Sequence, residues 1–227
     1  MFFSRIRLHS RAASDPGFFA RVADAYEAHS LVWDLFSDGP DRERDFLYRQ
    51  ESHEGLPAFY TLSERRPADR NGTWIVESKE FAPRLKAGQR LGFMLRANPI
   101  RSSWDLTTKK HHRHDVVMAA KRRLKEAEPD RTRWPTEPEL VREAGLAWLA
   151  QRAERCGFTF GPGEVGADGY RQLVFRKTQV ARPIQISTID YTGILTVTEP
   201  GVFIGALQAG IGPAKGFGCG LLLVRPA

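Results

Sequence analysis

The sequence predicts an α+β protein made of two units, in each of which helices cover one face of an antiparallel sheet. Strand-like and helix-like segments alternate in both halves of the chain, and a polar, basic stretch separates the halves. A chain of 227 residues is long enough to give each unit its own core. We therefore expect an N-terminal domain at residues 1–100, a basic connector at 101–135 and a C-terminal domain at 136–227.

The N-terminal half is expected to begin with a strand and a helix. Apolar side chains alternate along residues 1–8, which is typical of a half-buried strand. Asp15 offers an N-cap carboxylate before Pro16, which suits the first position of a helix. The side chains that then recur at helical spacing are Phe18, Val22, Tyr26, His29, Trp33 and Phe36. Further strands are predicted at residues 46–49, 58–62 and 91–96.

The pattern restarts after the connector, near whose end Pro129 and Pro135 stand. Helical spacing returns at residues 137–155, and a short helix is predicted at residues 201–209. Strands are predicted at residues 170–176, 184–197 and 221–224. The second unit is therefore expected to combine strands and helices as the first does, without a visible sequence repeat.

Composition limits the classes of protein to consider. The net charge is +7, with 34 Lys and Arg against 27 Asp and Glu, which favours a polyanionic partner without requiring one. Basic runs at residues 109–114 and 121–125 fit either RNA contact or a solvated linker. No apolar run approaches the ~20 residues of a membrane helix, so no membrane contact is expected. Cys156 and Cys219 are too few for a disulfide framework, and we expect a cytoplasmic protein.

Three histidines in the basic stretch raise the question of a metal site. His111, His112 and His114 stand close together in the sequence. Neither a carboxylate pattern nor a cysteine pattern accompanies them, and the neighbouring Lys110 and Arg113 are positively charged. Because these cations repel a metal ion, a basic linker is favoured. We therefore predict no metal and no cofactor.

The most distinctive segment is a glycine-rich stretch at residues 210–220. Glycine lets backbone N–H groups approach an anion closely, and Lys215 adds a positive charge. The segment is not a P-loop, because Lys215 is followed by Gly216 rather than by Ser or Thr. Two interpretations stay open together: anion binding, and a tight crossing in which glycines pack against a neighbouring helix. The glycines concerned are Gly210, Gly212, Gly216 and Gly218.

The order and spacing of four segments resemble those of a known enzyme family. Two Gly-hydrophobic-Gly triplets, residues 210–212 and 218–220, are separated by five residues, as in the signature loop of CRISPR repeat-processing endoribonucleases. Three further stretches narrow the resemblance to the CasE family, the processing subunit of the E-subtype Cascade complex. They are residues 26–36 (YEAHSLVWDLF), 44–48 (RDFLY) and 95–100 (LRANPI).

This resemblance implies two tandem ferredoxin-like domains of the RRM-like, βαββαβ kind. It also implies a metal-independent endoribonuclease in which a histidine promotes attack of a ribose 2′-OH on the adjacent phosphate, leaving 2′,3′-cyclic phosphate and 5′-OH ends. His29 matches that histidine, and Tyr26 matches a tyrosine that assists in some members. The implied partners are a CRISPR repeat RNA hairpin, whose product (crRNA) is retained, and the other Cascade subunits. The alternatives are a non-catalytic RNA-binding subunit of the same fold and a purely structural subunit.

The residue types suit the implied chemistry. Imidazole titrates near neutral pH and contributes ~10²–10⁴-fold as an acid or base, while half-buried packing is the alternative role for His29. Tyr26 lies one helical turn away, where it would orient the imidazole or contact the phosphate, and Lys215 would stabilise the phosphate. Basic residues that flank a predicted turn would lie along the RNA duplex or form a solvated hairpin tip. These residues are Arg176, Lys177 and Arg182.

Overall fold

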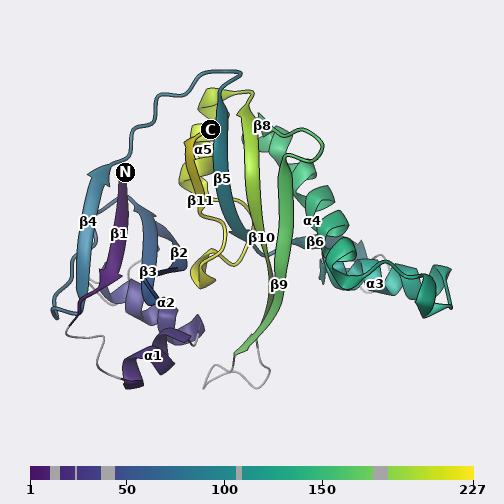
Figure 1. Cartoon of the computed structure of the whole chain (residues 1–227), viewed down its shortest axis with the longest axis horizontal. Helices are drawn as coiled ribbons and strands as arrows, with labels where there is room; N and C mark the ends of the chain where they lie inside the picture. The colour runs from purple at the N-terminus through teal and green to yellow at the C-terminus, as the bar shows by residue number, and fades with distance from the viewer. Residues whose placement is uncertain (11–15, 24, 37–43, 106–108, 176–183) are drawn as a thin grey trace.

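Two antiparallel sheets stand side by side in the computed structural model of the protein (Figure 1). The structure describes residues 1–10, 16–23, 25–36, 44–105, 109–175 and 184–227. Residues 81–89, which contain neither helix nor strand, carry the chain from the first sheet to the second across the top of the view. The α+β class and the antiparallel sheets that the sequence predicted are confirmed.

The first sheet has the strand order β2-β3-β1-β4. Its strands are β1 (Phe2–Leu8), β2 (Phe46–His53), β3 (Leu56–Ser63) and β4 (Trp74–Glu80). The predicted first helix is present as two helices, α1 (Pro16–Ala23) and α2 (Ala25–Asp34), which pack on one face of the sheet. Alternation along β1 buries Ile6 and Leu8 in the core beneath these helices, next to Phe59 of β3.

The first unit departs from the expected βαββαβ order, because residues 64–73 between β3 and β4 form no helix. The Asp69 carboxylate accepts hydrogen bonds from the backbone N–H groups of Asn71 (3.4 Å) and Trp74 (3.2 Å). Gly72 has a φ of +68°, which lies outside the right-handed helical region. Since short-range bonds of this kind compete with helix formation, the chain enters β4 through a turn.

The second sheet contains β11, β5, β10 and β8 in that order, and β9 pairs with β10. These strands are β5 (Arg90–Ala97), β8 (Phe158–Thr159), β9 (Val165–Phe175), β10 (Ile184–Val197) and β11 (Leu222–Pro226). Helices α4 (Glu137–Ala153) and α5 (Pro200–Ala209) share a core with the sheet through Leu149 and Phe203. Because β5 lies between β11 and β10, a domain boundary at residue 100 separates this strand from its own sheet.

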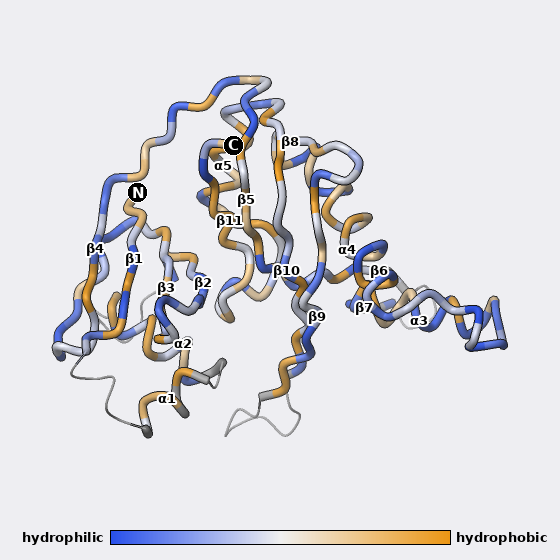
Figure 2. Tube along the Cα trace, viewed as in Figure 1, coloured by the Kyte–Doolittle hydropathy of each residue, from blue (hydrophilic) through white to orange (hydrophobic). Residues whose placement is uncertain are grey.

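The predicted connector, residues 101–135, is largely structured. Strands β6 (Ile100–Asp105) and β7 (Lys110–Asp115) form a hairpin, and α3 (Val116–Ala127) follows directly. Helix α3 begins after Asp115, whose carboxylate accepts the backbone N–H groups of Val117 (2.7 Å) and Met118 (2.8 Å). The helix projects from the body of the molecule, and hydrophilic residues lie at the far end of this arm (Figure 2). None of the helices that the structure describes is long and apolar enough to cross a membrane.

We expect Asp115→Ala to lower the free energy of unfolding by about 1–2 kcal/mol, because α3 loses its N-cap. The Tyr170 hydroxyl, which donates to the same carboxylate at 2.9 Å, loses its acceptor as well. Urea unfolding measures the loss. Asp168→Ala is the matched control, since it removes an exposed carboxylate from β9 and should change stability by less than about 0.5 kcal/mol. Equal destabilisation by the two variants would contradict the capping role.

Candidate active site

Helix α2 and the glycine-rich loop meet at His29. The centroid of the imidazole lies 6.0 Å from that of the Phe217 ring and 5.5 Å from that of Trp33. A Cβ atom placed on Gly216 would lie 3.8 Å from Cε1 of His29. A helix of the first unit and a loop of the second therefore border the same small space.

Helix α2 presents His29 at the margin of the first core. Ala28 and Val32 on the same helix are 1% and 0% exposed, whereas His29 is only half-buried. Tyr48 of β2 also lies near the imidazole, with 6.5 Å between the ring centroids. The histidine thus combines aromatic packing with an exposed part, and the two predicted roles of His29 do not exclude each other.

Three of the four predicted loop glycines pack tightly against protein side chains. Gly210 and Gly218 have φ angles of +77° and +75°, a left-handed conformation that favours glycine. The side chain that a Cβ atom would approach is Leu47 at Gly210 (2.9 Å), Trp148 at Gly212 (3.1 Å) and Tyr48 at Gly218 (3.3 Å). The tight crossing is therefore present, against strand β2 as well as helix α4. Contact of these glycines with RNA stays a prediction.

Arg44, which precedes β2, lies beside His29, and Lys215 directly precedes Gly216 in the loop. The Nη1 atom of Arg44 lies 3.3 Å from the point that a Cβ atom on Gly216 would occupy. Partial burial lowers the pKa of Lys215, and the positive charge of Arg44 lowers it further. Burial also lowers the pKa of Arg44. The site therefore holds two like charges in a partly desolvated setting, which favours an anion as ligand.

Tyr48 of β2 holds the glycine-rich loop in place through a hydrogen bond. Its hydroxyl donates a hydrogen bond to the carbonyl oxygen of Gly216 at 3.1 Å. Only 2% of Tyr48 is exposed, and burial raises the pKa of the phenol, so the hydroxyl stays protonated as a donor. This bond joins β2 of the first unit to the loop of the second, and it sets the position of Gly216 next to His29.

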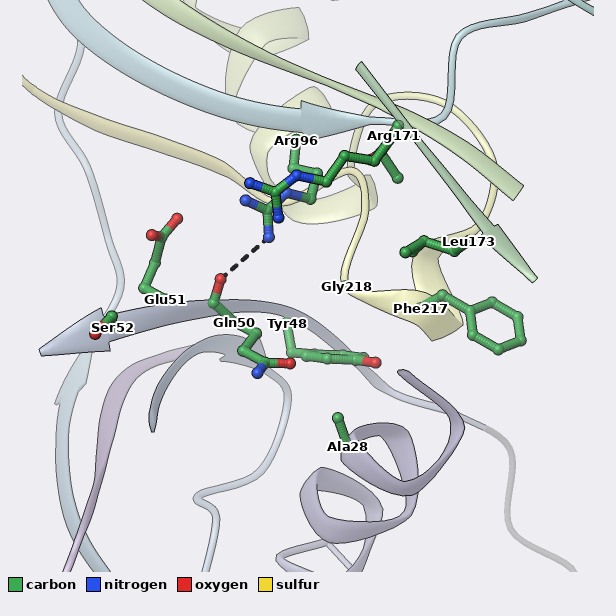
Figure 3. A pocket seen from close by; sticks show the side chains of 11 residues that line it. Ala28, Tyr48, Gln50, Glu51, Ser52, Arg96, Arg171, Leu173, Phe217 and Gly218 are labelled. Atoms are coloured by element: carbon green, nitrogen blue, oxygen red, sulfur yellow. Dashed lines mark hydrogen bonds between the residues drawn. The ribbon is translucent and has the colours of Figure 1, made fainter. Parts of the chain in front are cut away.

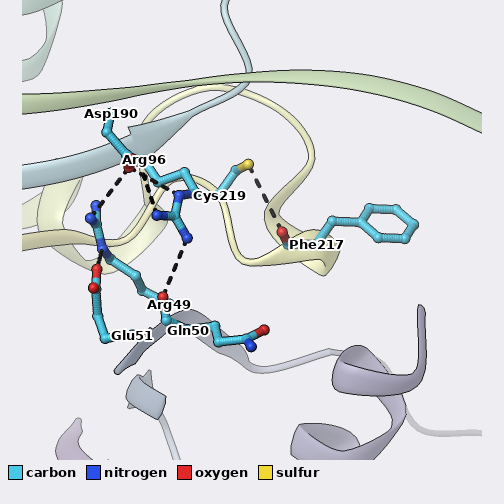
Figure 4. Close-up of polar contacts among 7 residues, drawn as sticks. All are labelled: Arg49, Gln50, Glu51, Arg96, Asp190, Phe217 and Cys219. Atoms are coloured by element: carbon cyan, nitrogen blue, oxygen red, sulfur yellow. Dashed lines mark hydrogen bonds and ion pairs between the residues drawn. The ribbon is translucent and has the colours of Figure 1, made fainter. Parts of the chain in front are cut away.

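A second polar connection ties the units together, with the carboxylate of Asp190 on β10 at its centre (Figure 4). Asp190 accepts two bonds of 2.9 Å from Arg96 on β5 and one of 3.3 Å from Arg49 on β2. Arg49 also pairs with Glu51, and Arg96 donates to the carbonyl oxygen of Gln50 at 3.3 Å. Arg49 and Arg96 are therefore neutralised within the protein, whereas among the described residues neither Arg44 nor Lys215 forms an ion pair.

A cavity of about 430 Å³ opens beside the site (Figure 3). Ala28 and Gln50 line it from the first unit, and Phe217 lines it from the glycine-rich loop. Arg96 and Arg171 reach into it from the second sheet toward Gln50. Arg171 is exposed and adds positive charge to this cavity, which Ala28 of the His29 helix also lines.

Several predicted site residues lie partly or wholly outside the described structure. Tyr26 is on α2, one turn before His29, and its side chain is outside the described part. Three predicted basic residues, Arg176, Lys177 and Arg182, lie outside the described residues. Strands β9 and β10 on either side of them pair antiparallel, so the two strands that were predicted to carry them are present.

The histidine cluster of the basic stretch lies on β7. In the part of the chain that the structure describes, no group of three or more His, Cys, Asp or Glu side chains is arranged to hold a metal ion. The side chains of His111 and His112 are outside that part, and His114 is half-buried. The expectation of no metal site therefore stays a prediction.

Four residues that shape the site were not predicted. Arg44 and Tyr48 stand in the RDFLY stretch, and Arg96 stands in the LRANPI stretch, so the resemblance pointed to these stretches without indicating what the side chains contact. Asp190 interrupts the otherwise apolar and neutral strand β10 between Ile189 and Tyr191. A carboxylate in a buried strand indicates a paired charge, and this signal was available in the sequence.

Comparison with known proteins gives a consistent result. A family model described as "CRISPR associated protein" matches residues 1–226. The Cascade subunit CasE of Escherichia coli K12 is 29% identical over 205 residues, which cover 89% of this chain and 92% of that protein. The CRISPR-associated endoribonuclease Cse3 of Thermus thermophilus is 28% identical over 220 residues, which cover 90% of this chain and 92% of that protein.

Solved structures agree with the sequence comparison. Cse3 bound to a 19-nucleotide RNA superimposes with a TM-score of 0.71 at 26% identity, covering 100% of both chains. Thermus thermophilus Cse3 bound to an RNA that represents a pre-cleavage complex has a TM-score of 0.70 at 26% identity, covering 99% of this chain and 98% of that one. The similarity therefore extends through both sheets.

We expect Gly218→Ala to lower the free energy of unfolding by about 2–4 kcal/mol, because a left-handed alanine is strained and its Cβ atom presses on Tyr48. Gly55→Ala is the matched control. Gly55 has nearly the same φ, +78°, but a Cβ atom there meets nothing within 4 Å, so only the backbone cost of about 1 kcal/mol remains. Chemical denaturation compares the two. Equal losses would show that the contact with Tyr48 is not tight.

Proposed function

Because the chain belongs to the CasE/Cse3 family of CRISPR-associated proteins, we propose that it is a metal-independent endoribonuclease that cuts the repeat hairpins of CRISPR precursor RNA. The family membership confirms the resemblance found in the four sequence segments. The observation that carries the proposal is the meeting of His29 with Gly216 next to two cations, since an acid–base group and an anion site then lie side by side.

In the proposed reaction a ribose 2′-oxygen attacks the adjacent phosphorus. The new 2′-O–P bond forms as the P–O5′ bond breaks, which leaves a 2′,3′-cyclic phosphate and a 5′-OH end. The 2′-OH loses one proton and the departing 5′-oxygen gains one, and His29 performs one or both of these transfers. Tyr26, one helical turn before His29, orients the imidazole or contacts the phosphate.

The negative charge that develops on the pentacoordinate phosphate calls for fixed cations and backbone donors in a preorganised site. Lys215 is our candidate in the loop, together with the backbone of Gly210, Gly212, Gly216 and Gly218. We further propose that Arg176, Lys177 and Arg182, between β9 and β10, lie along the RNA duplex and contact its phosphates.

The wider proposal concerns fold and partners. The strand order β2-β3-β1-β4 supports a ferredoxin-like first unit without a second helix, and we propose that the tandem units divide within residues 81–89, before β5, rather than at residue 100. We propose that the protein is cytoplasmic, binds the repeat hairpin, retains the crRNA and joins the other Cascade subunits. The name of the relative CasE, a Cascade subunit, and the RNA-bound structures of Cse3 support these partners.

A non-catalytic RNA-binding subunit is the second candidate function. The packing of His29 against Trp33 and Phe217 favours it, since the same contacts describe a histidine with a structural role. Both candidates bind RNA with an affinity that falls as salt rises. Only cleavage separates them, so the rate of cleavage must be measured apart from the affinity for RNA.

We expect His29→Ala to slow single-turnover cleavage of a repeat RNA by about 10²–10⁴-fold, because the acid–base group is lost. Gel-resolved rate constants at saturating protein measure the effect. His53→Ala is the control: it removes a histidine from the far end of β2 and should leave the rate unchanged. Cleavage by His29→Ala at the rate of the unsubstituted protein would rule out the catalytic role, and absence of cleavage in the unsubstituted protein would favour the second candidate.

Replacing the 2′-OH by hydrogen at the nucleotide before the cut should abolish cleavage and change the Kd by less than about threefold, because the nucleophile is removed while the phosphates remain. EDTA should leave the rate with ordinary RNA unaltered. The products are identified by mass spectrometry, and 2′,3′-cyclic phosphate ends are expected. Cutting of the 2′-deoxy RNA, or loss of cutting in EDTA, would instead indicate metal-dependent hydrolysis.

A further inference from the structure

Arg44 occupies a place in the site that the proposed function leaves without a role. It lies two residues before the start of β2, and its Nη1 atom lies 3.3 Å from the position of a Cβ atom on Gly216. The imidazole of His29 lies 3.8 Å from the same position. The guanidinium and the imidazole therefore flank one residue of the loop, where glycine leaves the space between them open.

Two carboxylates around the site, those of Asp45 and Asp190, are held by other arginines. The neighbouring carboxylate of Asp45 is held by Arg65 at 2.6 Å, and the Asp190 carboxylate is shared by Arg49 and Arg96. No ion pair joins Arg44 to any carboxylate in the described part of the chain. Each of these other arginines has a structural partner, whereas Arg44 directs its charge toward the space beside His29.

Arg44 and Lys215 influence each other. Lys215 directly precedes Gly216, the loop residue beside the Arg44 guanidinium, and the charge of Arg44 contributes to the lowered pKa of Lys215. Holding two cations together in a partly desolvated setting costs free energy unless an anion lies between them. The ordinary pKa of arginine is so high that Arg44 stays charged despite its own lowered pKa. The pair is thus preorganised for a phosphate.

We infer that Arg44 is a catalytic residue: with Lys215 it binds the scissile phosphate and stabilises the pentacoordinate phosphate formed by 2′-OH attack. This inference rests on the proposed function. A guanidinium presents two parallel N–H donors to two phosphate oxygens, which an ammonium group does not. The two cations come from different units, so the phosphate site is complete only when the loop is docked on β2.

The test compares single-turnover cleavage by Arg44→Gln, Arg44→Lys and the unsubstituted protein. Arg44→Gln should be slower by about 10²–10³-fold, the effect of losing one fixed transition-state donor. Arg44→Lys keeps the charge but loses the planar fork, so its rate should fall between the other two. Arg84→Gln is the control, because it removes the same charge from the exposed segment between the sheets and should cut at the unsubstituted rate.

Binding is measured in parallel with the 2′-deoxy repeat RNA. The Kd of Arg44→Gln should rise by less than about tenfold, since one phosphate contact is lost, and the slope of log Kd against log salt should fall by roughly 0.7–0.9. Because Arg44 makes no ion pair with a described residue and repels Lys215, the substitution should not lower the melting temperature. Millimolar guanidinium should restore part of the cleavage by Arg44→Ala and none of that by His29→Ala.

The outcomes separate this inference from the proposed function. Cleavage by Arg44→Gln within about threefold of the unsubstituted protein would overturn the inference and leave the proposed function standing. The inference would also fail if Arg84→Gln slowed cleavage as much as Arg44→Gln does. It would fail likewise if Arg44→Gln changed only the Kd for RNA and not the cleavage rate. If the unsubstituted protein binds the repeat RNA without cutting it, the proposed function itself fails.

Discussion

The docking of the glycine-rich loop on strand β2 is the constraint on which the site depends. Gly210 and Gly218 leave room for Leu47 and Tyr48, and the Tyr48 hydroxyl holds the carbonyl of Gly216. Leu47 also joins an apolar cluster that contains residues of both units, including Leu62 of β3 and Leu221 beside β11. A side chain at either glycine would push the loop away from β2, and the groups on the loop would then move away from those on α2.

The Asp190 network adds specificity to this docking rather than much net stability. Arg49 is 2% exposed, and the desolvation of a buried guanidinium offsets most of the gain from its ion pairs. A misaligned arrangement of the two units would leave Arg49 or Asp190 without its partner, which costs several kcal/mol in a buried setting. The network therefore disfavours alternative placements of β2 against β5 and β10, while the apolar cluster supplies the attraction.

Local patterns in the sequence predicted what local physics determines. Alternation in residues 1–8 and the helical spacing that includes His29 describe elements whose buried faces are visible in a short window. The assignment of β5 to the second sheet was not predictable in this way, because its partners β10 and β11 lie about 90 residues or more further along the chain. The meeting of Arg44, His29 and Lys215 is non-local in the same sense. The turn at Asp69 is local, and its hydrogen bonds explain why no second helix forms in the first unit.

In the proposed function, substrate binding and the docking of the two units are linked. Without an anion, Arg44 and Lys215 repel each other across the contact that brings them together, which weakens the docked arrangement. A phosphate between them removes that repulsion and adds attraction to both units at once. Any ligand that binds only the docked form stabilises it by mass action, so RNA with a phosphate at this point reinforces the loop on β2. In the proposed reaction the scissile phosphate would then help to complete the site that cleaves it. An RNA whose hairpin placed no phosphate between Arg44 and Lys215 would be bound without being cut.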